Sequence, residues 1–105
     1  MIAMNARMES TRVRLEKLLA GHPATSGLSV RVYGSHLILA RQETLPPATR
    51  PEDDDRVRIT QLSDRTYGLS VKRHTGRWEK TPFVGGLDET VSTIQTFMQH
   101  LVASY

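Results

Sequence analysis

The segment whose residue types most suggest chemistry is YGLSVKRHTGRWEKT at residues 67–81, which reads as a β-hairpin. It gathers four cations, a histidine and the only tryptophan of the chain. Lys72, Arg73, His74 and Arg77 surround the expected tip, where clustered positive charge could bind an anion. An ordinary solvated hairpin end has the same composition, so the cluster by itself does not define a site.

The place of Trp78 depends on how this hairpin closes. If Arg73 pairs with Trp78 across a four-residue loop, the indole lies on the buried face of its strand. A three-residue loop with Gly76 in a bulge instead pairs Arg73 with Arg77 and moves the indole to the other face. The first register keeps like charges apart and buries the largest side chain, so we expect Trp78 to be a core residue sheltered by Arg73. A base-stacking platform is the alternative.

The sequence shows no spacing typical of an active site. The chain has no cysteine, which excludes disulfides, thiolate metal sites and a thiol nucleophile. Its four histidines are not spaced as metal ligands, and the acidic run 53–55 falls in an expected flexible loop. No glycine pattern forms a phosphate-binding loop. We therefore predict no catalytic residues, no metal and no cofactor, and a protein that is not an enzyme.

Charge is separated along the chain. Residues 43–55 hold five acids against one arginine, whereas residues 56–83 hold seven cations against two acids. The acidic segment also contains three prolines, which favour extended, unpaired backbone. We predict that 43–55 is a mobile acidic loop that could fold over the cations and compete with an anionic ligand.

Hydrophobic periodicity predicts the elements around these residues. Apolar residues at three- and four-residue spacing predict helices over about 5–20 and 88–102. Alternation of apolar and polar residues predicts strands at about 28–33, 36–42, 56–62, 66–73 and 77–83. Because strand follows strand through short links, the sheet should be mainly antiparallel. The 105 residues then form a single α+β domain.

The predicted fold class is a two-layer sandwich of order α-β-β-β-β-β-α. Each helix has one apolar stripe, so both terminal helices should cover the same face of a sheet of four or five strands. The opposite face would be open, and alternation places Arg31, Arg58 and Lys72 on it, with Tyr33 near its edge and His74 at the hairpin tip. Cations and an aromatic on a sheet can bind single-stranded nucleic acid, although no defined nucleic-acid motif occurs.

Association is the function that this layout favours. Apolar residues that two helices cannot cover, such as Phe83, Val84 and Phe97, could contact a second copy or a partner protein. Binding of single-stranded nucleic acid or another polyanion is the alternative, and an uncharacterised enzyme is a second alternative. No apolar run reaches the length of a membrane span, and the absence of cysteine suits a cytoplasmic protein. The sequence does not identify a ligand or a partner.

Overall fold

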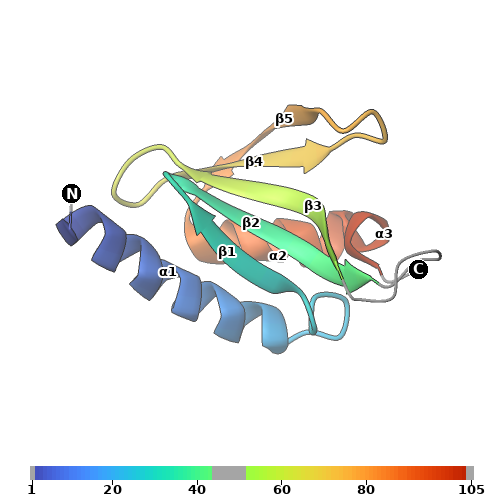
Figure 1. Cartoon of the computed structure of the whole chain (residues 1–105), viewed down its shortest axis with the longest axis horizontal. Coiled ribbons are helices and arrows are strands. Elements are labelled where there is room, and N and C mark those ends of the chain that lie inside the picture. The colour runs from blue at the N-terminus through green and yellow to red at the C-terminus, as the bar shows by residue number, and fades with distance from the viewer. Residues whose placement is uncertain (1, 44–51, 104–105) are drawn as a thin grey trace.

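A computed structural model describes residues 2–43 and 52–103 of the chain. Eight elements follow one another along it, and their bounds are α1 Ile2–Ala20, β1 Ser29–Tyr33, β2 His36–Glu43, β3 Glu52–Gln61, β4 Tyr67–Lys72, β5 Trp78–Gly85, α2 Leu87–Phe97 and α3 Gln99–Val102. The five strands form one antiparallel sheet in the order of the sequence, and α2 lies behind the strands while α1 runs beside β1 (Figure 1). The predicted α+β class is confirmed.

All helices cover the same face of the sheet. A single cluster of buried side chains joins α1, through Leu15 and Leu19, to α2, through Val91 and Ile94, and to the inward residues of the strands. The two long helices also touch directly, since Gln95 donates to the carbonyl of Leu18 at 3.3 Å. Burial of these apolar side chains is the main stabilising term of so small a domain. We call the uncovered side the outer face.

The helices begin and end where local chemistry allows. Gly21 and Pro23 follow α1, and neither residue favours another helical turn. At the start of α2, Glu89 accepts a hydrogen bond from the Gly86 N–H at 3.1 Å, which satisfies one of the free amides of the first turn. The predicted helix 88–102 is in fact two helices, because the chain leaves helical geometry at Met98 with φ −122° and ψ 23°.

Part of the predicted acidic loop is strand. Glu43 ends β2 and residues 52–55 begin β3, so the boundaries 43–55 were too wide, while residues 44–51 lie outside the described part of the chain. The register explains how. Leu39 pairs with Val57 but Ala40 pairs with Asp55, so Arg56 is an extra residue in a β-bulge. The bulge lets the acidic run continue the sheet.

The preferred hairpin register was wrong. Lys72 pairs with Trp78, Val71 pairs with Glu79, and the Arg73 N–H donates to the carbonyl of Arg77 at 2.8 Å. Gly76 has φ +86°, the left-handed conformation that a bulged three-residue loop requires and that glycine adopts without strain. The like charges that this register opposes are relieved because Arg73 bonds Glu79 at 2.8 Å. Trp78 is therefore not a core residue but lies on the outer face.

Candidate binding face

The outer face is built from rows of side chains that run across the strands. One row, defined by the strand register, consists of Arg31, Ile38, Arg58, Ser70 and Lys80. The next consists of Tyr33, His36, Thr60, Gly68 and Val84. The sequence thus placed Arg31, Tyr33, Arg58 and Lys72 on the correct side of the sheet, and it missed Trp78, His36 and Lys80.

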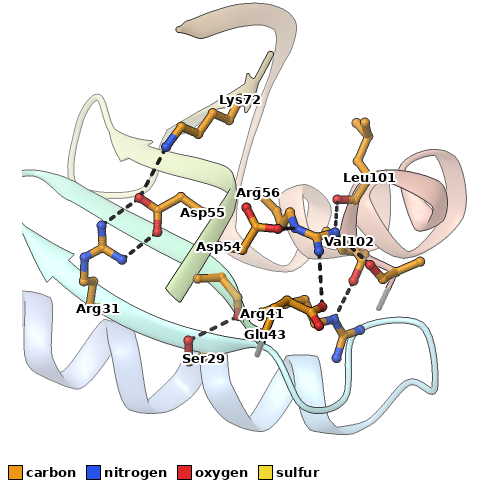
Figure 2. A network of polar contacts seen from close by, with 12 residues as sticks. Ser29, Arg31, Arg41, Glu43, Asp54, Asp55, Arg56, Lys72, Leu101 and Val102 are labelled. Atoms are coloured by element: carbon orange, nitrogen blue, oxygen red, sulfur yellow. Dashed lines mark hydrogen bonds and ion pairs between the residues drawn. The ribbon is translucent and has the colours of Figure 1, made fainter. Parts of the chain in front are cut away.

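Two of the predicted anion-binding cations lie beside carboxylates of the same chain. Arg31 forms two hydrogen bonds with Asp55, at 2.7 Å and 2.8 Å, and contacts Asp53 at 3.4 Å. Lys72 approaches the same Asp55 carboxylate at 3.9 Å (Figure 2). The hydrogen bond from Arg31 lowers the pKa of Asp55 against the opposing effect of burial, so this carboxylate is charged at neutral pH. The end of the predicted acidic segment thus contacts both cations, and competition with an anionic ligand stays a prediction.

On the helix side of the sheet, two other arginines bind groups of the chain itself. Arg56 is only 9% exposed, bonds Asp54 at 3.0 Å and donates to the carbonyls of Leu101 and Ala103. Arg41 donates to the carbonyl of Val102 at 2.6 Å (Figure 2). These two arginines supply donors to carbonyls at the end of α3, which a short helix leaves without partners. This network is structural, and its cations are not free for a ligand.

Arg58 differs from its charged neighbours. Its guanidinium carbon lies 5.0 Å from the centre of the Trp78 ring, and the Lys72 ammonium lies 5.8 Å from the same centre. Both distances allow a cation–π interaction. Among the described residues no acid or carbonyl accepts a hydrogen bond from Arg58, and its Nε atom is buried without a partner. The cation is held in place by an aromatic ring and keeps its hydrogen-bonding capacity.

A groove of about 340 Å³ lies beside Arg58 on the outer face. Its charged and polar walls come from four strands, β2 to β5, and include His36, Arg58, Ser70 and Lys80. Its apolar part includes Leu62, Leu69 and Val84, and the missing side chain of Gly68 leaves room for Leu62. We call this the outer-face groove. No acidic residue is among the described residues that line it.

The pairing of β5 is irregular beside the groove. Gly68 pairs with Val84 but Ser70 pairs with Lys80, so three residues of β5 lie opposite Leu69 alone. Thr81 fixes this arrangement by donating its hydroxyl to the carbonyl of Leu69 at 2.8 Å. Pro82 lies inside the irregular stretch and has no N–H for a ladder bond. The Thr-Pro pair was the one sequence signal that could have revealed the groove.

His36 is neutral in this setting. Burial lowers its pKa, and the positive charge of Arg58 lowers it further. Its Nδ1 lies 2.8 Å from the Thr60 hydroxyl, which fixes the ring at the groove wall. A neutral imidazole beside a cation adds hydrogen-bonding capacity without adding positive charge.

The remaining predicted site residues do not join this groove. Arg73 is paired with Glu79, and His74 and Arg77 are exposed at the hairpin tip with no side-chain partner among residues 2–43 and 52–103. Tyr33 is 70% exposed at the opposite edge of the outer face. In the described ranges no group of three His, Cys, Asp or Glu side chains is placed to hold a metal ion. None of the described helices is long and apolar enough to cross a membrane.

Comparisons with protein-family models, with curated proteins and with solved structures find no match to this chain.

Proposed function

We propose that the chain is a non-enzymatic binding domain that associates with a partner protein through the outer face of its sheet. The observation that carries the proposal is the outer-face groove, in which Arg58 and Lys80 have no acidic partner among the described residues. Leu62 and Val84 line the same groove while they are 57% and 60% exposed. A concave surface with apolar walls and a few unpaired polar groups is the usual form of a binding site.

A partner other than a second copy fits the charge of this face. Among the described residues, the register places Arg31, Arg58, Lys72 and Lys80 on it, together with the acids Asp53 and Asp55. Two such faces would repel each other, whereas an acidic surface would be attracted. Nucleic acid is less well supported, since Asp55 already occupies two of the cations and Tyr33 is the only aromatic of the face that is largely exposed among the described residues.

Association through the edge of the sheet is also less well supported. The edge strand β5 contains Lys80, Pro82 and the irregular pairing opposite Leu69. All three features oppose the addition of another strand at this edge. The face of the sheet is then a better surface for a partner than the edge at β5. Within this proposal the domain works in the cytoplasm, the setting that a chain without cysteine suits.

Photo-crosslinking in a lysate of the native host tests the proposal. p-Benzoyl-phenylalanine replaces Tyr33 on the outer face or, as a matched control, Phe97, a 68% exposed aromatic of α2. We expect a discrete adduct from position 33 that disappears with Val84→Ser, and none from position 97. Adducts from position 97 alone, or from neither position, would contradict the proposal. An adduct of twice the mass of the chain would show self-association instead.

A further inference from the structure

The guanidinium of Arg58 has hydrogen-bond donors that the described part of the chain does not use. A guanidinium has five N–H groups, and none of those of Arg58 donates to an acceptor among the described residues. Of its nitrogens only Nε is buried, so the two terminal NH₂ groups remain accessible to an acceptor from outside the chain. Stacking on Trp78 holds the group in place but gives these donors no acceptor. The arrangement is that of a cation preorganised for an acceptor from outside the chain.

The surroundings restrict what that acceptor can be. Lys80 lines the same groove, so the acceptor lies between two positive charges and should be an anion. A carboxylate matches the fork of a guanidinium and can take both contacts. The apolar residues Leu62 and Val84 adjoin these cations, so a group beside the carboxylate can bury apolar surface between them.

We infer that the outer-face groove receives an acidic peptide segment of the partner. A Glu or Asp carboxylate pairs with Arg58 and Lys80, and an apolar side chain next to it packs between Leu62 and Val84 over Gly68. This inference rests on the proposed function, because it names the partner chemistry of the same face. The volume of about 340 Å³ accommodates one or two side chains, not a folded element.

A nucleic-acid strand is the competing occupant. Its affinity would come from several phosphates spaced along the face, which needs a row of free cations. Two further cations would extend the row, but Arg31 is held by two hydrogen bonds to Asp55, and Lys72 lies 3.9 Å from the same carboxylate. One pair of cations beside an apolar wall therefore favours a peptide side-chain pair over a phosphate chain.

Titration of the ¹⁵N-labelled protein with defined probes tests the inference. The probes are acetyl-Leu-Glu-Leu-Glu-Leu-amide, the same peptide with lysine for glutamate, the same peptide with glycine for leucine, and a ten-residue oligothymidylate. We expect the first peptide to shift the amides of Gly68, Ser70 and Lys80 and to bind at least about tenfold more tightly than the others, a difference of about 1.4 kcal/mol. Equal binding of the lysine peptide, or tighter binding of the oligothymidylate, would overturn the inference.

Variants locate the effect. Arg58→Gln should weaken the Leu-Glu peptide about tenfold and Val84→Ser about threefold, as expected for a charge-assisted contact and a partly buried apolar contact. The matched controls are Arg77→Gln, an exposed cation at the hairpin tip, and Val13→Ser, a 44% exposed residue of α1. If the control variants lose as much peptide affinity as the groove variants, the inference is overturned. Peptide binding lost in Arg58→Gln while the crosslink from position 33 persists would refute only the groove, not association through the outer face.

Discussion

Arg58 lies over Trp78, with 5.0 Å between the guanidinium carbon and the centre of the ring. The contact links β3 to β5, which do not pair with each other because β4 lies between them. It also explains why the largest side chain of the chain lies outside the core: the indole covers cations rather than helices. Because Trp78 is the only tryptophan, its fluorescence reports on the cation beside the groove.

Replacing Trp78 with leucine should destabilise the domain by about 1–2 kcal/mol, since a cation–π contact and part of an aromatic surface are lost. A core tryptophan would lose more, about 3–5 kcal/mol on truncation. Urea unfolding followed by circular dichroism measures the difference. Trp78→Phe, which keeps an aromatic ring, should restore most of the loss. A loss above about 3 kcal/mol in Trp78→Leu would mean that the indole is part of the core after all.

Asp55 should make stability depend on pH in the acid range. Its pKa in the folded state is lowered, mainly by the hydrogen bond from Arg31, so it stabilises the fold above its ordinary value of 3.8 and loses this effect as the pH falls. Asp55→Asn should be less stable than the native chain at pH 6, and the difference should shrink toward pH 2.5. Thermal unfolding at several pH values tests this, with Asp64→Asn, an exposed pair with Arg7, as the control. A difference that does not change with pH would contradict the prediction.

His36 should titrate below the usual value of 6.5, because burial and the charge of Arg58 both disfavour its protonated form. The folded state then binds fewer protons than the unfolded state, so protonation of His36 destabilises the domain as the pH falls below about 6.5. Ring-proton NMR should place the pKa of His36 below the ordinary value of 6.5, and Arg58→Gln should raise it. An unchanged His36 pKa in Arg58→Gln would show that the two groups do not interact.

Removal of Arg56 should be among the most damaging single changes. Arg56→Met leaves Asp54 and the carbonyls of Leu101 and Ala103 without this donor, and losing hydrogen bonds to a charged group typically costs about 1.5–3 kcal/mol. Hydrogen exchange of the α3 amides should accelerate together with the loss of stability. Arg77→Met, an exposed cation without a side-chain partner in the described chain, should change stability by less than about 0.5 kcal/mol. Equal effects would contradict the role given to Arg56.

The helices, the strands and the open face follow from periodicity, because each of these elements has one apolar side. Alternation also assigned Arg31 and Lys72 to the outer face correctly. Alternation predicted the wrong face wherever one strand has extra residues opposite its partner strand. The bulge at Arg56 turns Asp55 outward against the parity of Val57, and the irregular stretch of β5 lies beside the groove. A one-residue change in pairing exchanges the two faces, and single-sequence patterns do not specify such changes.

The hairpin shows the same limit for a different reason. Burial of Trp78 and separation of Arg73 from Arg77 both favoured the wrong register. The conformation of Gly76 and the diagonal bond from Arg73 to Glu79 outweighed them. Turn geometry and a side-chain contact two positions away are tertiary facts, so the face on which Trp78 lies could not be predicted from the sequence.

The attachment of α3 has a consequence for the order in which the domain assembles. Arg41 and Arg56 come from neighbouring strands and must be brought together by the β2–β3 ladder before both can hold the carbonyls of Leu101, Val102 and Ala103. The antiparallel strands can pair locally, one hairpin after another, because their contacts are close in sequence. We expect α3 to dock only after β2 and β3 have paired. Docking of α3 is then a late folding step. In chains whose central strands are mispaired, α3 would stay undocked and accessible to proteases.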